Sequence, residues 1–318
     1  SAMYHAKSLG RNNFQFFDQK MNERSRELLS METSLREALL NDKLQVLYQP
    51  QVDIETGEMV GVETLARWQH PTRGLIGAGN FLPFAEQSGL HAALDRTILT
   101  AACRQLVTWQ SMSLPAFPVS VNICAKNFDT GDLHAMVTQV LDQTGADPNL
   151  LALEITESHV AREGTATVRT LEALRNMGIR IVIDDFGTGF ASLSYLRKFP
   201  VDEVKIDKSF VQELPNNRSD GAIVRAVLAL ADELELKVIG EGVERQEQLQ
   251  WLRSHGLRVV QGYLTGEPLS PIQIIQRVMH AETDPPKPHE LSSERIEEPV
   301  TSGYDFSTGS FARRAPST

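Results

Sequence analysis

Short apolar runs alternate along the chain with longer stretches that have the spacing of amphipathic helices. The apolar runs occupy residues 44–54, 59–68, 118–123, 150–155, 179–185, 202–207, 236–242 and 257–263. Helical spacing is found over residues 80–112, 129–144, 164–177, 190–198, 219–234, 245–254 and 271–281. A strand followed by a helix, repeated this often, predicts a parallel sheet of the α/β class. About eight strands favour a closed, TIM-like (β/α)8 barrel, with a doubly wound open sheet as the alternative.

The first two runs are separated only by the turn Glu55-Thr56-Gly57-Glu58. This connection is too short for a helical crossover, so the two strands should pair antiparallel. The predicted barrel therefore has an irregular, antiparallel first strand.

Four segments can be separated along the chain. Residues 43–282 form the expected barrel, and residues 19–42, with Leu28, Leu35 and Leu39 on one face, predict an amphipathic linker helix. Residues 1–18 look like the end of a preceding domain. Residues 283–318 are rich in Ser, Glu, Pro and Thr and lack apolar periodicity, which predicts a disordered tail.

Composition excludes several classes of protein. The chain has 318 residues, of which 41% are hydrophobic and 23% charged, and two cysteines, Cys103 and Cys124, without a CxxC spacing. A disulfide framework and a structural zinc site are therefore not expected. The net charge of -10 argues against binding to duplex nucleic acid. With no apolar stretch long enough to span a membrane, we expect a cytoplasmic domain, and membrane attachment of a parent protein stays open.

Polar residues gather at the carboxyl ends of the predicted strands, where a barrel of this kind carries its chemistry. One acidic strand end alone would usually be a solvated cap. Polar groups on seven strands instead predict a site for Mg²⁺ or Mn²⁺, and two ions would suit hydrolysis of a phosphodiester. Lys205 could be a counter-ion or could orient the attacking water. The residues at the strand ends are Glu63, Asn122, Glu154, Asp184, Asp185, Lys205, Glu241 and Gln261.

Several strings resemble the EAL-domain phosphodiesterases that hydrolyse cyclic di-GMP. They are VETLARW at 62–68, VNICA at 121–125, LEITES at 153–158, IDDFGTGFASLSYLRKFPVDEVKIDKSFV at 183–211, GEGVE at 240–244 and QGY at 261–263. The resemblance covers roughly residues 35–282. Residues 1–18 are similar to the last helix and strand of a GGDEF domain, without its active-site signature.

The resemblance implies a role for each matching residue. It implies that Lys205 and Glu241 are catalytic and that the product is the linear dinucleotide pGpG, which ends second-messenger signalling. The implied ligands of the first metal are Glu63, Asn122, Glu154 and Asp184, and those of the second are Asp184, Asp185 and Glu241. The implied substrate contacts are Gln49 with guanine, Arg67 with phosphate, and Gln261. Glu157 and Glu244 would support the loop after the two aspartates.

The chain departs from the family pattern at Thr64, where the name motif has alanine, and at Ile123-Cys124, where Leu-Ser is more usual. Neither position is an expected ligand. A catalytically inactive cyclic di-GMP receptor that signals through the linker helix is the main alternative. Another Mg²⁺ barrel enzyme with Lys205 as base is a third hypothesis. The remaining expectations are two bound ions, inhibition by Ca²⁺, a homodimer and an upstream GGDEF domain.

Overall fold

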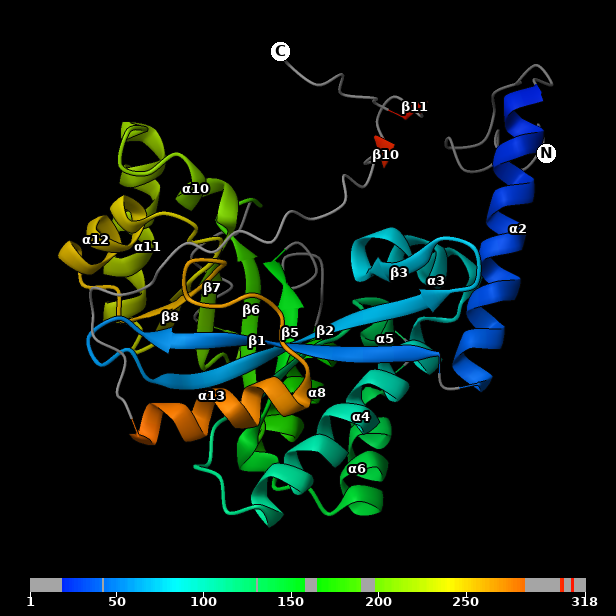
Figure 1. Ribbon diagram of the computed structural model, residues 1–318, viewed down its shortest axis with the longest axis horizontal. Coiled ribbons are helices and arrows are strands. Elements are labelled where there is room, and N and C mark those ends of the chain that lie inside the picture. Colours follow the sequence, from blue (N-terminus) through cyan, green and yellow to red (C-terminus); the bar gives the residue numbers. More distant parts are fainter. Residues whose placement is uncertain are drawn as a thin grey trace.

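The computed structural model is a barrel of strands surrounded by helices (Figure 1). The residues that the structure describes are 19–41, 43–129, 131–157, 165–189, 198–283, 304–305 and 310–311. The segment at 1–18 and almost all of the helix expected at 190–198 lie outside them. Within the tail expected to be disordered, the structure describes only two short paired strands, β10 (Tyr304–Asp305) and β11 (Ser310–Phe311).

Each apolar run of the sequence forms one strand of the barrel, which confirms the predicted fold class. The strand order is β1-β9-β8-β7-β6-β5-β4-β2, and pairing of β1 with β2 closes the barrel. Strand β1 is antiparallel to both β2 and β9, whereas the other neighbours are parallel. The strands are β1 (Leu44–Asp53), β2 (Met59–His70), β4 (Val119–Asn122), β5 (Leu151–Thr156), β6 (Arg180–Phe186), β7 (Glu203–Ile206), β8 (Lys237–Gly240) and β9 (Val259–Gln261).

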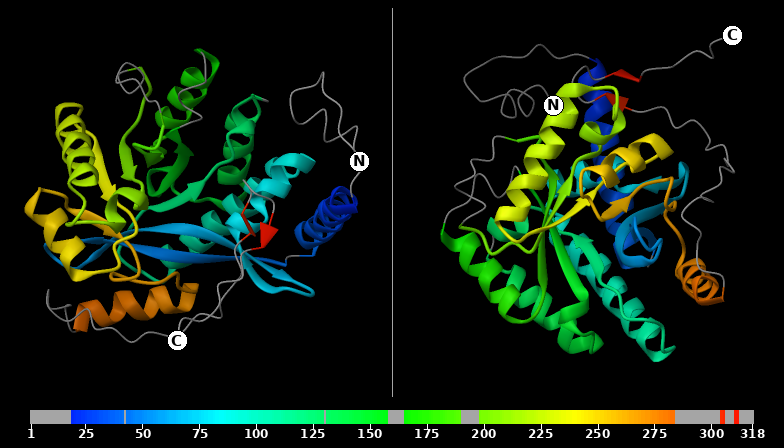
Figure 2. Two further views of the ribbon diagram at one scale, coloured as in Figure 1. Left: turned by 90° about the horizontal axis from the view of Figure 1, so that it is seen from above. Right: turned by 90° about the vertical axis from the view of Figure 1, so that its left-hand side faces the viewer.

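Helices cover the outside of the barrel, and α13 lies along β1 (Figure 2). They are α2 (Gln19–Leu40), α3 (Leu82–Ser88), α4 (His91–Ser111), α5 (Lys126–Asp129), α6 (Leu133–Thr144), α8 (Thr165–Asn176), α10 (Lys208–Gln212), α11 (Arg218–Glu233), α12 (Gln246–Ser254) and α13 (Pro271–Thr283). Short 3-10 turns occupy Ala78–Asn80 and Pro148–Leu150.

The core lies between the strands and these helices. Outward-facing strand residues such as Val119, Val121 and Ile181 are fully buried beneath the helical layer. This arrangement explains why the parallel strands read as nearly continuous apolar runs. The side chains that point into the barrel are then free to be polar at one end.

The α2 helix packs on the barrel through Met31, Leu35 and Ala38, all of which are buried. It contacts α3, α4 and β2. The helix expected at 19–42 therefore exists over 19–40, and its role as a linker stays a prediction.

Two expected helices have other bounds in the structure. The stretch at 80–112 is broken at Gly89, whose positive φ of 73° ends α3 before α4 begins. The helix expected at 129–144 begins later, as α6 at Leu133, and Gly131 with a φ of 73° separates it from the short α5 that ends at Asp129. A further strand, β3 (Gly74–Gly77), forms a hairpin with β2 that the sequence did not predict. Glycine at these turns accepts a left-handed backbone that other residues adopt rarely.

Candidate metal and active site

Lys205 lies at the centre of the polar residues inside the barrel. Its side chain is completely buried, and its Nζ lies 2.5 Å from Glu241, 2.8 Å from Glu154, 2.9 Å from Glu63 and 3.4 Å from Asp184. The four carboxylates come from β2, β5, β6 and the turn after β8. The barrel therefore brings together residues that are far apart in the sequence, at the carboxyl ends of its strands.

The pKa values of these groups reflect burial and crowding of like charges. Burial lowers the pKa of Lys205, but the surrounding carboxylates raise it well above its usual value. Burial and the charge of Glu63 raise the pKa of Glu154 well above its usual value. Burial raises the pKa of Glu63, but Lys205 and hydrogen bonds to neighbours lower it overall. Burial raises the pKa of Glu241 to about 7 against the opposing effect of Lys205. One ammonium group thus leaves negative charge in the cluster uncompensated.

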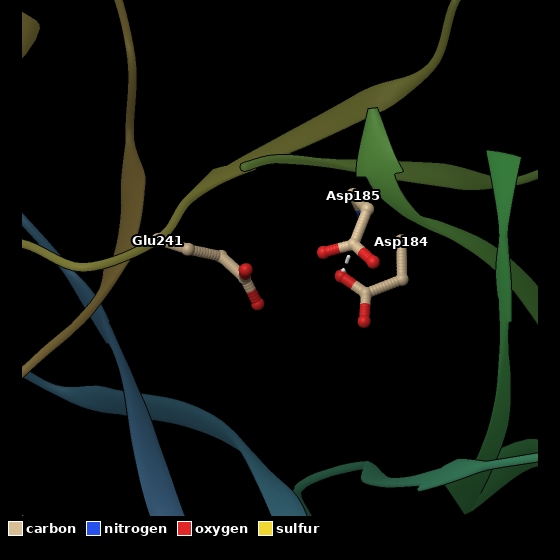
Figure 3. Close-up of side chains that lie close together, drawn as sticks. All are labelled: Asp184, Asp185 and Glu241. Carbon is tan, nitrogen blue, oxygen red and sulfur yellow. Dashed lines mark hydrogen bonds between the residues drawn. The ribbon is translucent and has the colours of Figure 1, made fainter. Parts of the chain in front are cut away.

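Asp184 and Asp185 are consecutive, yet their carboxylates lie close together. Pairing of β6 with β7 shifts register between Ile183 and Phe186, and Asp185 has a φ of 54°. This bulge breaks the usual alternation of side chains along a strand. Figure 3 shows Glu241 extending toward the two aspartates, and all three offer oxygens within 4.8 Å of one another. Burial and the charge of Asp184 raise the pKa of Asp185 to about 6.

The residues of the cluster fit hard divalent cations. Glu154 Oε1 is buried and has no hydrogen-bond partner among the described residues, although the other oxygen of this carboxylate binds Lys205. Asn122 donates its amide NH₂ group to Glu63 Oε1 at 2.7 Å, which leaves its amide oxygen as a potential ligand. Carboxylate and amide oxygens are the ligands that Mg²⁺ and Mn²⁺ prefer. A buried oxygen without a partner is costly unless a ligand satisfies it.

A chain of glutamine amides extends from the cluster along β9 and β1. Gln261 Nε2 donates to Glu63 Oε2 at 2.6 Å and to Gln49 Oε1 at 3.1 Å. Gln49 in turn donates to the carbonyl of Gly266 at 3.2 Å. Gln51 donates to Gln261 Oε1 at 3.2 Å and was missed in the sequence, although its period-two spacing from Gln49 was a usable signal. The two predicted glutamines therefore lie side by side at the edge of the cluster.

Arg67 lies farther along β2 than Glu63, on the same side of the strand by period-two spacing, and is half-buried. Its guanidinium donates to the carbonyl of Ala66 at 3.1 Å. Arg67 pairs with Gly77 of β3, so the unpredicted hairpin lies beside it.

Glu157 supports the loop that follows the two aspartates. It is 2% exposed, and its Oε2 accepts a hydrogen bond from the N–H of Gly187 at 2.6 Å. Gly187 has a φ of 100°, which favours glycine. The contact agrees with the loop-supporting position that the resemblance implies for Glu157, and the effect of this residue on activity stays a prediction. Residues 190–193 of the same loop lie outside the described residues.

Glu244, another predicted site residue, also lies apart from the cluster. It is exposed just before α12, and its backbone N–H donates to Gln248 Oε1 at 2.8 Å. It is the last residue of the EGVE segment at 241–244, which begins with Glu241 of the cluster. A role for its carboxylate in supporting the loop stays a prediction.

A cavity of about 830 Å³ lies at the opposite end of the barrel, where the strands begin. Four of its charged residues form ion pairs, since Arg180 lies 2.9 Å from Glu203 and Arg258 lies 3.0 Å from Asp53. In barrels of this type that end contributes to stability, whereas chemistry occurs at the carboxyl ends of the strands.

Among the described residues, no helix is both long and apolar enough to cross a membrane.

Comparisons with known proteins agree with this geometry. The chain is 42% identical over 278 residues to the bifunctional diguanylate cyclase/cyclic di-GMP phosphodiesterase MucR of Pseudomonas aeruginosa, covering 87% of this chain and 41% of MucR. It is 40% identical over 280 residues to the cyclic di-GMP phosphodiesterase NbdA of the same organism, covering 88% of this chain and 36% of NbdA. The chain thus spans less than half the length of these relatives.

A solved structure described as PaMucR phosphodiesterase in complex with c-di-GMP superimposes with a TM-score of 0.74. It is 41% identical and covers 77% of this chain and 99% of its own. Residues 32–268 match the EAL domain family. This match includes every strand of the barrel and every residue of the carboxylate cluster. The chain therefore belongs to the EAL domain family.

Proposed function

We propose that this chain hydrolyses cyclic di-GMP to linear pGpG with the help of divalent cations. The observation that carries the proposal is the group of four carboxylates around the buried Lys205, in which one buried oxygen of Glu154 has no partner among the described residues. The names of MucR and NbdA and the c-di-GMP complex of the MucR domain support the choice of substrate.

Two groups of residues would hold two cations, Mg²⁺ or Mn²⁺. Glu63, Asn122, Glu154 and Asp184 would hold the first, and Asp184 would share the second with Asp185 and Glu241. Bound divalent cations would make water available as a nucleophile near neutral pH and would stabilise negative charge on the phosphodiester. The orphaned oxygen of Glu154 and the close oxygens of the Asp184, Asp185 and Glu241 group support this assignment.

The protein's own groups would perform the remaining tasks. Lys205 keeps four carboxylates converged at distances of 2.5–3.4 Å from its Nζ. Cations bound to the same carboxylates would draw them away from Lys205 and so free its N–H groups to donate to water or to a phosphate oxygen. Gln49 and Gln261 offer amide donors and acceptors of the kind that can bind a guanine edge. Arg67 carries the positive charge suited to a phosphate.

Hydrolysis can be tested on purified protein by incubating cyclic di-GMP with Mg²⁺, Mn²⁺ or EDTA and separating the nucleotides. We expect pGpG with either metal and intact substrate in EDTA. Glu172→Ala, on the exposed face of α8, is a control that should keep full activity. Binding of cyclic di-GMP without turnover in either metal would overturn the proposal and would favour the receptor hypothesis. The homodimer, the upstream GGDEF domain and the linker role of α2 stay predictions.

A further inference from the structure

The backbone that carries Asn122 has little support from β2. Asn122 is the last residue of the four-residue strand β4. The pairing between β2 and β4 consists of Val62 with Val119 and Glu63 with Ser120, so it ends two residues before Asn122. The side chains of Glu63 and Asn122 nevertheless meet at 2.7 Å across this seam.

Thr64 adds a side-chain contact at the point where this ladder ends. Its Oγ1 donates to the carbonyl oxygen of Ser120 at 2.8 Å, and the residue is 3% exposed. Thr64 stands where the name motif of the family has alanine. An alanine has no hydroxyl, so this chain holds β2 and β4 together by a bond that the usual residue could not make.

On its other side Asn122 is paired with Glu154 of β5, and Asp95 of the α4 helix binds the segment that follows it. It is 2% exposed, and its Oδ2 accepts hydrogen bonds from the backbone N–H of Cys124 at 2.7 Å and from Asn127 Nδ2 at 2.5 Å. A buried carboxyl group is costly unless hydrogen bonds satisfy it. The segment after Asn122 is therefore fixed to a helix outside the barrel.

We propose that Thr64 and Asp95 are positioning residues that hold Asn122 in place beside Glu63 and thereby set the affinity of the first cation site. The proposal rests on the metal dependence proposed above. Mg²⁺ requires nearly ideal octahedral geometry, so a ligand whose backbone shifts by a few tenths of an ångström binds it less well. Removing a residue that orients a metal ligand through a hydrogen bond typically lowers the metal affinity by about 10- to 100-fold.

Mn²⁺ binding measured by titration calorimetry without nucleotide tests this role. We expect the dissociation constant of the first site to rise about 10-fold or more in Asp95→Ala and about 3-fold in Thr64→Ala. Asp95→Asn keeps an oxygen that can accept the Cys124 N–H, so it should bind Mn²⁺ better than Asp95→Ala. The Mg²⁺ concentration for half-maximal hydrolysis should rise in the same order.

The matched control is Asp202→Ala at the opposite end of the barrel. Asp202 also accepts a backbone N–H, from Ile181 at 3.0 Å, and pairs with Arg175 at 2.8 Å. Its loss should lower the unfolding temperature without changing Mn²⁺ affinity. Hydrogen–deuterium exchange of the metal-free protein should show faster exchange at residues 123–127 in Asp95→Ala and not in Asp202→Ala.

Three outcomes separate this proposal from the proposed function. Wild-type protein that binds no Mn²⁺ would overturn both. Wild-type binding with unchanged affinity in Asp95→Ala and Thr64→Ala would overturn only the positioning role. A loss of affinity in Asp202→Ala as large as in Asp95→Ala would also overturn it, because the effect would then follow from general destabilisation. If Asp95→Ala does not fold, Thr64→Ala decides by the same criterion.

Discussion

Replacing Lys205 with methionine removes the positive charge that four carboxylates share. Methionine keeps an unbranched chain that fits the same space, so packing changes little. Glu63, Glu154, Asp184 and Glu241 would then face one another without the ammonium that now lies 2.5–3.4 Å from them. We expect the metal-free variant to be destabilised.

The size of the destabilisation follows from the burial of Lys205 and its carboxylate partners. Removing one partner of a buried ion pair typically costs about 3–5 kcal/mol. In a domain of this size each kcal/mol lost from the free energy of unfolding lowers the unfolding temperature by about 2–4 °C. The unfolding temperature should therefore fall by roughly 6–20 °C in EDTA. Saturating Mg²⁺ would restore positive charge to the cluster, so the difference from wild type should become smaller.

Scanning calorimetry of wild type and variant, in EDTA and in Mg²⁺, measures both effects. Lys237→Met is the matched control, because Lys237 is 71% exposed and lies 3.8 Å from Glu203 at the other end of the barrel. Surface pairs of this kind contribute about 0–1 kcal/mol. If the unfolding temperature of Lys205→Met in EDTA falls no further than that of Lys237→Met, the reasoning is refuted.

The hydrolysis rate of Lys205→Met in Mg²⁺ then separates the two roles of this lysine. A rate close to that of wild type would assign Lys205 as a counter-ion. A lost rate with a restored unfolding temperature would assign it to the reacting groups.

Four further predictions concern single residues or ions. Glu63→Ala and Asp184→Ala should each reduce hydrolysis at least 10-fold, and Glu63→Ala with more than about a tenth of wild-type turnover would contradict its assignment as a ligand. Ca²⁺ should inhibit, because its longer bonds and looser geometry orient water less well, and full activity in Ca²⁺ alone would exclude this. Glu157→Ala removes the acceptor of the Gly187 N–H, so it should lower turnover and raise the Mg²⁺ requirement while the barrel stays folded; an unchanged Mg²⁺ curve would contradict this role. Burial raises the pKa of Asp95 from 3.8 to about 7, so native protein keeps this proton where unfolded chain has lost it. As the pH rises from about 4 to about 7, the free energy of unfolding of wild type, measured with urea, should therefore fall by about 1.4 kcal/mol per pH unit relative to that of Asp95→Asn. A difference that stays constant over this range would argue against the raised pKa.

The barrel and its polar end could be predicted from the sequence because both depend on local patterns. Strands that helices cover on the outside read as apolar runs, and the polar residue at the end of each run marks the mouth of the barrel. Strand β3 escaped prediction because Gly74–Gly77 is too short to show a period. The helical periodicity of 80–112 continued across Gly89, so the sequence did not reveal the break there.

Contacts between distant segments could not be predicted in the same way. The sequence predicted Lys205 and the four carboxylates at one mouth of the barrel, but not which of their atoms meet, because the distances of 2.5–3.4 Å around its Nζ depend on how the barrel closes. Asp95 carried a signal that was not used, since it lies next to Leu94 and three residues before Ile98 on the buried face of α4. The donors that satisfy it, in Cys124 and Asn127, became visible only in the fold.

A single turnover of cyclic di-GMP in ¹⁸O-labelled water, with enzyme in excess, tests most directly whether the carboxylate cluster supports metal-dependent hydrolysis. Attack of water on one phosphorus and cleavage of its bond to the 3′ oxygen would place ¹⁸O on the terminal phosphate of pGpG. The account predicts this labelled product in Mg²⁺ or Mn²⁺ and its absence in EDTA. Cyclic di-GMP that is bound but recovered intact and unlabelled in the presence of either metal would contradict it.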